Sequence, residues 1–385
     1  MKIALVHDYL KEYGGAERVL EALHEIWPEA SVHTLVYLPE FLGPHRERLK
    51  DWNIKPIIPN WIPLINKLIS PLRLVAPILF KCLDLSDYDV VIVSATGAYN
   101  PNLLKTKPGA HICYCHTPPR YLYGLPTARE WKKYWWIRIP AEIANHFLRL
   151  IDFQSAQKVD WFIANSKNTA ARIKKFYRKE ALVIYPPVEI KSKRVKEQES
   201  KSGKYFLAGG RLARPKRIDL AIKACNQLKL PLKVYGKMFA GYGEELKKIA
   251  GPTIEFLGEV SDQKLAQLYA GCQAFIFPAE EEDFGIVPVE ALSFGKPVIA
   301  LRQGGVVESV IEGKTGEFFD PPATPARSAG GRGEPTVESL TGVLRKFKPE
   351  KYKPEDCRNQ AKKFSKERFK KEIKKFVEEK YARIA

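Results

Sequence analysis

The sequence has no uncharged apolar run of the roughly 20 residues that a membrane-spanning helix requires. Lys67, Arg73 and Lys81 interrupt the best candidate. The N-terminal strand pattern runs straight into a polar loop and lacks the length and cleavage pattern of a secretory signal peptide. We therefore expect a cytoplasmic protein, either free or peripheral on the inner face of the cell membrane.

Metal-binding motifs are also missing. The six cysteines are scattered, and no C-x-x-C or cysteine–histidine cluster suggests a zinc site. Only Cys113 and Cys115 are close, and alternate residues of a strand point to the same face. We expect no bound metal and free, mostly buried thiols in a reducing compartment.

The phosphate-binding fingerprints of two large enzyme classes are absent as well. The chain contains neither G-x-G-x-x-G nor G-x-x-x-x-G-K-S/T. These glycine-rich turns cradle the phosphates in dinucleotide-dependent dehydrogenases and in P-loop NTPases. Both classes lose their main support, and we expect no cofactor.

The charge, in contrast, is strongly one-sided. Lys and Arg number 63 against 44 Asp and Glu, a formal net charge of +19. Such an excess indicates an anionic partner: nucleic acid, an anionic membrane face or phosphorylated substrates. Because the basic residues are spread through both halves and no nucleic-acid reader module is recognisable, we expect no nucleic-acid partner.

The 385 residues suit two domains. Short apolar strands alternate with segments of helical period, which predicts parallel sheets covered by helices. The expected strands are residues 3–6, 90–93, 112–115, 161–164 and 182–185 in the first half, and 205–208, 232–235, 254–257, 274–277 and 297–300 in the second.

We therefore expect an α/β protein of two Rossmann-like doubly wound domains that face each other across a cleft, where the carboxyl ends of strands bind ligands. The first domain spans residues 1–188 and the second 205–361. The polar residues 189–204 are expected to form a linker, and residues 321–335, rich in Pro, Gly and Ala, a long loop. A basic helix at about 362–385 is expected to pack back on the first domain.

Residues 280–290 (EEEDFGIVPVE) follow an expected strand and lead into a helix. Unpaired amides at a helix start can hold a phosphate or sugar oxygen, and Gly285 allows close approach. Glu282 and Glu290 can accept hydrogen bonds from the paired hydroxyls of ribose or a hexose. The pattern also fits a solvated acidic loop in which Glu290 is a helix-start charge.

Residues 209–217 (GGRLARPKR) gather four cations between another expected strand and helix: Arg211, Arg214, Lys216 and Arg217. Cations are disfavoured at a helix N-terminus. An anion such as a diphosphate would relieve the arrangement, and Arg with Lys can neutralise it without a metal. The alternative is a basic surface loop.

Two features of the first half are weaker signals. Gly14 and Gly15 lie between the first expected strand and the first helix, where they form either a phosphate-approaching loop or a plain turn. His116 ends an expected strand, and the prolines that follow stiffen the turn that would aim its imidazole. It can donate to a sugar hydroxyl or phosphate, or it can be a structural histidine.

Together these segments resemble family 4 of the retaining glycosyltransferases, which have the two-Rossmann-domain GT-B fold. The resemblance covers nearly the whole chain and is densest in residues 209–319. The family's E-x7-E signature matches Glu282 through Glu290, and its G-R-L-x-x-x-K signature matches residues 210–216. Further similar segments are residues 265–277, Gly304-Gly305 with Glu308, and the run HTPPRYLY at 116–123, which is similar to bacterial O-antigen mannosyltransferases.

The resemblance implies roles for individual residues, catalytic or donor-binding. Glu282 would bind hydroxyls of the transferred sugar, Glu290 would bind the ribose, and His116 would lie at the reacting centre. The other implied donor contacts are the side chains of Arg211 and Lys216 on the diphosphate, the amides around Phe284, Gly285 and Ile286, and the approach of Gly14 and Gly15 to the phosphate. Residues 236–238 depart from the Gly-x-Gly turn of many relatives, which puts recognition of the base in doubt.

The resemblance implies metal-independent transfer of a hexose, with mannose first, from a nucleoside diphosphate sugar to a saccharide or polyprenyl-diphosphate-linked acceptor in cell-surface polysaccharide synthesis. GDP-mannose is the favoured donor, with a UDP-sugar as the alternative. Apolar residues of helical spacing at 65–79, and Trp131, Tyr134, Trp135 and Trp136 among basic residues, suit either an anionic lipid interface or ordinary helices. A non-catalytic protein that binds sugar nucleotides is the remaining alternative.

Overall fold

A computed structural model describes residues 1–62, 65–128, 135–189, 205–320 and 335–383. The expected linker and the expected loop at 321–335 therefore lie almost wholly outside the described residues. The chain divides into two compact units. Unit 1 comprises Met1–Leu125, Trp131–Pro187 and Lys366–Ala385, and unit 2 comprises Pro126–Glu130 and Val188–Ser365.

Unit 1 is built on a seven-stranded parallel sheet in the order β3-β2-β1-β4-β5-β6-β7. The chain reverses its direction of strand addition between β1 and β4, so these two strands form the switch point of the sheet. The strands are β1 (Ile3–His7), β2 (Ser31–Thr34), β3 (Ile54–Pro56), β4 (Val90–Ala95), β5 (His111–Cys115), β6 (Trp161–Ala164) and β7 (Ala181–Val183).

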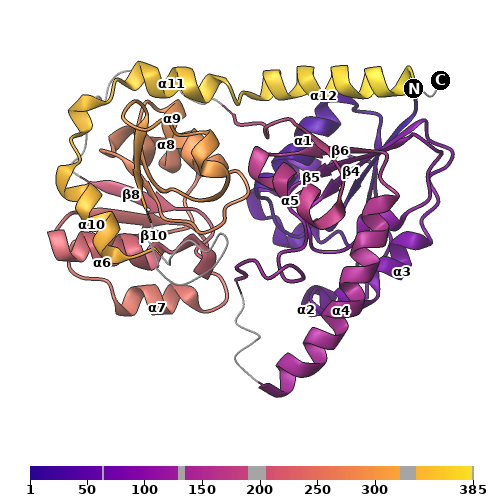
Figure 1. The fold of residues 1–385 in the computed structure, drawn as a ribbon, viewed down its shortest axis with the longest axis horizontal. Helices are drawn as coiled ribbons and strands as arrows, with labels where there is room; N and C mark the ends of the chain where they lie inside the picture. The colour runs from indigo at the N-terminus through magenta and orange to yellow at the C-terminus, as the bar shows by residue number, and fades with distance from the viewer. Residues whose placement is uncertain (63–64, 129–134, 190–204, 321–334, 384–385) are drawn as a thin grey trace. The chain divides into compact units, whose positions relative to one another are not determined.

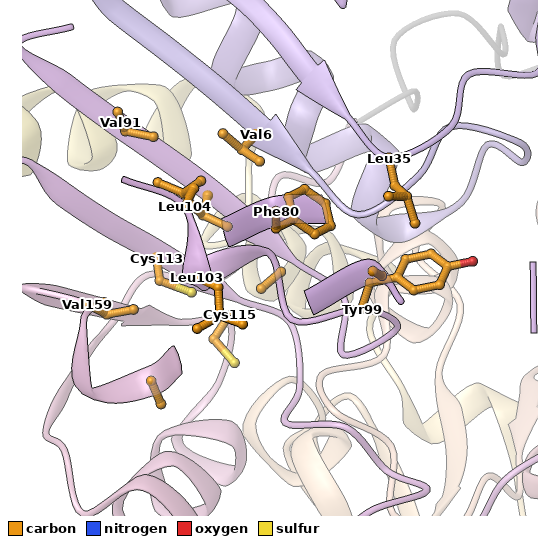
Figure 2. Close-up of a cluster of buried hydrophobic side chains, with 14 of the residues drawn as sticks. Val6, Leu35, Phe80, Val91, Tyr99, Leu103, Leu104, Cys113, Cys115 and Val159 are labelled. Atoms are coloured by element: carbon orange, nitrogen blue, oxygen red, sulfur yellow. The ribbon is translucent and has the colours of Figure 1, made fainter. Parts of the chain in front are cut away.

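Both faces of this sheet are buried. Along β4, Val91 and Val93 belong to one apolar cluster, while Val90 and Ile92 belong to another on the opposite face. Figure 2 shows the first cluster, in which Phe80 lies among side chains of the neighbouring strands. Alternate strand residues thus enter two cores, as parallel sheets require.

Helices cover the two faces of the unit 1 sheet (Figure 1). Side chains of α3, α4 and α5 enter the cluster of Figure 2, and those of α1 and α12 enter the opposite one. The helices are α1 (Gly15–Ile26), α2 (Ile65–Leu68), α3 (Ala76–Lys81), α4 (Trp135–Gln157), α5 (Lys167–Tyr177) and α12 (Lys366–Tyr381).

Unit 2 has a six-stranded parallel sheet in the order β10-β9-β8-β11-β12-β13. Its switch point lies between β8 and β11. The elements are β8 (Phe206–Gly209), α6 (Ile218–Leu228), β9 (Leu232–Tyr235), α7 (Tyr242–Lys248), β10 (Ile254–Gly258), α8 (Asp262–Gly271), β11 (Phe275–Phe277), α9 (Ile286–Ser293), β12 (Val298–Leu301), β13 (Gly316–Phe319), α10 (Val337–Lys346) and α11 (Pro354–Lys362). The expected α/β class with two doubly wound parallel sheets is confirmed.

Some local expectations were wrong. The helical spacing at 65–79 does not give one helix, because Pro71 and Pro77 divide the segment into α2, a 3-10 turn at Pro71–Leu74 and α3. The basic helix begins only at Lys366, so Phe364 lies outside it and packs on Phe284 in unit 2. All of the expected strands form, but the sequence analysis did not predict three strands that the structure contains: β2, β3 and β13.

The expected thiol chemistry is confirmed for the described residues. No disulfide joins the six cysteines, all of which lie in the described residues, and five are buried while Cys82 is exposed. Cys113 and Cys115, alternate residues of β5, both enter the cluster of Figure 2. Burial raises the pKa of the Cys113 thiol, so this cysteine stays protonated and serves as a small apolar side chain.

Candidate functional site

The two motif-bearing loops of unit 2 meet at the switch point of its sheet. The loop at 210–217 follows β8 and the loop at 278–285 follows β11, and these strands are parallel neighbours. Their carboxyl ends therefore lie at one edge. A direct backbone contact joins the loops, since the Glu280 N–H donates to the Pro215 carbonyl at 2.8 Å.

A short ion pair connects the same two loops. Lys216 Nζ lies 2.5 Å from Glu282 Oε2, and the side chains are 25% and 19% exposed. A second pair joins Arg217 to Glu280. The two signatures found by sequence, G-R-L-x-x-x-K and E-x7-E, are thus in contact, although their paired residues lie 66 positions apart.

The four cations of residues 209–217 were expected to need an anion to relieve their charge, but they have partners within the protein. They do not form an unrelieved cluster: Lys216 pairs with Glu282, Arg217 with Glu280 and Asp219, and Arg214 with Glu245. The Arg211 guanidinium lies 5.5 Å from the centre of the Phe239 ring. Carboxylates from other segments compensate Arg214, Lys216 and Arg217, so local charge alone does not demand an anion here.

The Glu282 loop packs closely against neighbouring segments of unit 2. The Phe284 ring is buried against Phe364, with ring centres 5.3 Å apart. Gly305 donates its N–H to the Glu282 carbonyl at 2.7 Å. Gly304 has φ +74°, and a Cβ there would lie 2.3 Å from the same carbonyl oxygen, so only glycine lets the two loops approach so closely.

Glu290 does not lie at the helix start. Helix α9 begins at Ile286 after Gly285, whose φ of 88° suits a glycine, and Glu290 is its fifth residue. The carboxylate accepts a hydrogen bond from the Tyr269 hydroxyl at 3.3 Å, and Tyr269 in turn lies 2.7 Å from the Tyr235 hydroxyl. The alternative in which Glu290 interacts with the first turn of the helix is therefore wrong.

Residues 236–238, which depart from the Gly-x-Gly turn of many relatives, lie at the same edge of the unit 2 sheet, where the carboxyl ends of the strands meet. Gly236 has φ +122°, and a Cβ there would lie 1.7 Å from the Gly210 carbonyl oxygen, so a glycine is required at this position. Lys237 forms an exposed ion pair with Glu259, and the Met238 side chain lies close against Gly243. The side chain at 238 thus fills space where relatives with a Gly-x-Gly turn have none.

In unit 1, His116 directly follows β5 and is almost fully buried. Its Nε2 lies 2.9 Å from the Ser94 hydroxyl. Burial, with a smaller contribution from His7, lowers the pKa of the His116 imidazole to about 3, so this side chain is neutral at physiological pH. Both the structural and the site interpretation of His116 are compatible with this neutral state.

The glycine pair begins the first helix of unit 1. Gly14 precedes α1, and its N–H donates to Glu17 Oε2 at 2.8 Å; Gly15 is the first helical residue. Sequence reasoning missed the carboxylate partner Glu17 and the Ser94 hydroxyl. The available signals were a glutamate three residues after a helix cap and a serine inside the apolar run VVIVSA.

Among the described side chains, no group of three or more His, Cys, Asp or Glu could hold a metal ion. In the same part of the chain, no helix is both long and apolar enough to cross a bilayer.

Family models match most of the chain. The model "Glycosyltransferase Family 4" matches residues 13–192, and "Glycosyl transferases group 1" matches residues 189–331. The second match contains both signatures that meet at the unit 2 switch point. The chain belongs to glycosyltransferase family 4. The activity class that the sequence predicted, sugar transfer, is thereby confirmed.

Curated relatives agree with this family. The mouse alpha-1,3/1,6-mannosyltransferase ALG2 is 27% identical over 351 residues, covering 80% of this chain and 81% of the mouse protein. The protein of the same name from Schizosaccharomyces pombe is 27% identical over 367 residues, covering 82% and 70%.

Solved structures confirm the GT-B fold. The Anabaena protein HepE in complex with UDP superposes with a TM-score of 0.67 at 18% identity, covering 98% of this chain and all of HepE. Sucrose-phosphate synthase from Thermosynechococcus elongatus gives 0.72 at 15% identity, covering 99% and 100%. At these identities the likeness concerns the fold alone.

Proposed function

We propose that this family 4 glycosyltransferase transfers mannose from GDP-mannose to a saccharide acceptor, with retention at the anomeric carbon. One observation carries the proposal: the Lys216–Glu282 ion pair at the unit 2 switch point, which joins the family's two signatures. Relatives named as mannosyltransferases support the sugar. Structural neighbours solved with UDP and UDP-glucose support a nucleoside diphosphate sugar as donor class.

The ion pair suits a donor that carries phosphates and hydroxyls. In the free protein Lys216 and Glu282 neutralise each other. A bound diphosphate would take the Lys216 ammonium, because a charge-assisted bond to phosphate is strong. Glu282 is then released to accept hydrogen bonds from sugar hydroxyls, and Glu290, held by Tyr269, to accept those of the ribose.

The reaction needs stabilisation of the departing group above all. The bond between the anomeric carbon and the phosphate oxygen breaks, and the acceptor oxygen bonds to the same face of that carbon. The departing phosphate oxygen takes the acceptor's proton, so no separate base is required. Arg211, Lys216 and the amides around Phe284, Gly285 and Ile286 supply fixed positive potential for the diphosphate, without a metal.

The test compares Lys216→Ala with Lys233→Ala. Lys233 is a matched control because it lies in the same unit, pairs with Glu255 at 3.1 Å and is 31% exposed. Losing a charged hydrogen bond costs about 1.5–3 kcal/mol, so we expect Lys216→Ala to lower kcat/KM about 10- to 150-fold. Lys233→Ala should stay within about threefold of the parent protein.

The same assay separates the alternatives. Transfer or hydrolysis of GDP-mannose, but not of UDP-sugars, is the expected result. Turnover of a UDP-sugar instead would show that the donor is a UDP-sugar, and the proposed mechanism would still apply. A rise in melting temperature with sugar nucleotides, but no hydrolysis or transfer, would identify a non-catalytic binding protein. Turnover by Lys216→Ala within threefold of the parent protein would refute the assigned role.

We further propose that the acceptor is lipid-linked and that unit 1 contacts an anionic membrane. The observation is an apolar stripe on α4, formed by Trp136, Ile139, Ile143, Phe147 and Leu150, each between 52% and 60% exposed. These residues recur every three or four positions and therefore form one face. The opposite face is buried through Asn145, Leu148 and Asp152.

Charge supports a lipid as the occupant of this stripe. Residues 52–83 contain four cations and no Asp or Glu, and their helix α3 contacts the turn Pro101–Leu103 on which α4 also packs. Exposed apolar residues beside a segment that has cations and no acids suit an anionic interface. Trp131 and Tyr134, also predicted for this interface, lie outside the described residues.

Vesicle flotation tests the stripe. The parent protein should float with vesicles that contain phosphatidylglycerol and less with neutral ones. Phe147→Gln should weaken flotation, while Leu182→Gln, which alters an apolar residue of β7 that is 50% exposed against 60% for Phe147, should not. Equal flotation of both variants, or none by the parent protein, would refute the membrane proposal and leave the assigned donor chemistry intact.

A further inference from the structure

A line of buried polar side chains connects the glycine pair of unit 1 to His116. Glu17 Oε2 accepts the Gly14 N–H at 2.8 Å, and Glu17 Oε1 lies 3.5 Å from His7 Nε2. His7 Nδ1 lies 3.0 Å from the Ser94 hydroxyl, which lies 2.9 Å from His116 Nε2. The two contacts of Ser94 are hydrogen bonds, whereas Glu17 and His7 make a charge contact, because His7 Nε2 has no hydrogen-bond partner among the described residues.

The line is closed to solvent. His7 and Ser94 are fully buried, and Glu17 is 6% exposed. The three elements that supply these residues meet at the switch point of the unit 1 sheet, where His7 ends β1, Ser94 lies in the neighbouring β4 and Glu17 is in the first turn of α1. The Ser94 hydroxyl has one proton for its two imidazole neighbours, so the proton position on His7 constrains that on His116.

The Glu17 carboxylate determines which atom donates and which accepts at each hydrogen bond of the line. A negative charge beside His7 Nε2 favours the tautomer whose N–H points toward Glu17, since a lone pair there would be repelled. His7 Nδ1 is then an acceptor, and the Ser94 hydroxyl must donate to it. The Ser94 oxygen consequently accepts from His116 Nε2–H, which leaves His116 Nδ1 without a proton.

We propose that Glu17, His7 and Ser94 are positioning residues that fix His116 in the Nε2–H tautomer, so that Nδ1 acts as a hydrogen-bond acceptor. The ligand group that such a nitrogen recognises is a hydroxyl, not a phosphate oxygen, because a phosphate oxygen at neutral pH offers no proton. The expectation that His116 donates to a phosphate is thereby replaced. That His116 faces the donor sugar rests on the proposed function, whereas its tautomer does not.

Burial supports the neutral form that a tautomer requires. The pKa of His116 is lowered to about 3, so a second proton is absent at physiological pH. A structural histidine would need only to be buried. Here Glu17, which begins the line to His116, also accepts the N–H of Gly14. The line therefore couples the His116 tautomer to the glycine loop, a second predicted contact of the donor.

The decisive variant is Glu17→Gln. The new amide oxygen can keep the bond to the Gly14 N–H, which orients the amide nitrogen toward His7 Nε2. A donor now faces that nitrogen, so His7 must carry its proton on Nδ1 and donate to Ser94. The Ser94 hydroxyl turns to His116 Nε2, and the His116 proton moves to Nδ1, two hydrogen bonds away from the substitution.

Nuclear magnetic resonance of the full chain with nitrogen-15-labelled histidine measures the tautomer directly, with His116 assigned from the signals missing in His116→Gln. The parent protein should show His116 protonated on Nε2, and Glu17→Gln should show it protonated on Nδ1. Glu21→Gln, on the same helix but paired with Arg48, should leave the tautomer unchanged. A tautomer that Glu17→Gln does not invert, or a parent protein already protonated on Nδ1, would overturn the proposal.

Activity provides a second, separable measurement. If Glu17→Gln melts like the parent protein, it should lower kcat/KM at least about tenfold, because the wrong His116 tautomer presents a donor where an acceptor is required. An inverted tautomer with unchanged kcat/KM would refute a role of His116 in the reaction while the line itself stands. A tautomer that stays unchanged while Lys216→Ala still impairs turnover would refute the line and leave the proposed function intact.

Discussion

Gly304→Ala should displace the loop that carries Glu282. Gly304 has φ +74°, and an added Cβ would lie 2.3 Å from the Glu282 carbonyl oxygen and 2.7 Å from its nitrogen. Both are backbone atoms, so no side-chain rotation can relieve the contact. Real Cβ atoms essentially never come within 3.0 Å of such atoms, which means that the loop must move by about 0.7 Å or more.

Two effects follow from this substitution, and they can be separated. An alanine in the left-handed region costs about 1–2 kcal/mol of stability whatever surrounds it. Displacement of a positioned group by about 1 Å costs up to about 100-fold in rate. The 2.5 Å ion pair between Lys216 and Glu282 allows little of this movement without breaking.

Gly313→Ala isolates the first effect. Gly313 has φ +70°, but an added Cβ there meets nothing within 4 Å. In urea denaturation Gly313→Ala should lose about 1–2 kcal/mol of stability and Gly304→Ala at least as much, whereas Gly304→Ala alone should lower kcat/KM with GDP-mannose, by about 10- to 100-fold. If the two variants retained kcat/KM values within threefold of each other, the loop would not be what positions Glu282, and the reasoning would fail.

Two further predictions concern single side chains. Burial raises the pKa of Asp152 to about 7; the folded state therefore binds its proton more tightly than the unfolded state, and stability falls as pH rises from about 4 to 7, by roughly 1.4 kcal/mol per unit. Asp152→Asn should remove that fall, seen as a smaller drop in melting temperature between pH 5 and 8; an unchanged pH profile would contradict it. Tyr269→Phe should raise the donor KM about fivefold through loss of the Glu290 hydrogen bond, whereas Tyr205→Phe, which loses a bond to a backbone carbonyl, should not.

The site in unit 2 was largely predictable because its motifs directly follow strands. Lys216 and Glu282 are far apart in sequence, but each lies in a loop at the carboxyl end of a parallel strand. Sequence cannot give the strand order, yet any doubly wound order places such loops at one edge. Contact between the two side chains follows only because β8 and β11 are neighbours.

The compensation of the cations was not predictable, for a physical reason. Sequence reasoning weighs charges along the chain, and residues 209–217 contain no acid. Glu245 and Glu280, the partners of Arg214 and Arg217, come from α7 and from the loop after β11. Local charge density therefore overstated the need for an anion, although it located the loop.

Short or polar strands were not predicted from the sequence, for a different reason. β2 reads SVHT, and its Ser31, His33 and Thr34 are buried polar residues rather than apolar ones. β3 has three residues and ends in Pro56 at the sheet edge, where a missing N–H is tolerated. The same limitation hid Ser94, because a polar residue in a strand reveals its purpose only through its partners.

The compensated site also bears on the purpose of the large positive charge. Residues 209–217 contribute four cations, and residues 278–290, which meet them, contribute five carboxylates. The donor loops of unit 2 therefore carry none of the surplus of +19. A donor diphosphate binds there by exchanging partners, as Lys216 leaves Glu282, so donor affinity needs no excess charge. The surplus lies instead in segments such as residues 52–83, which have cations and no acids, and an extended anionic surface explains it better than a single small ligand does.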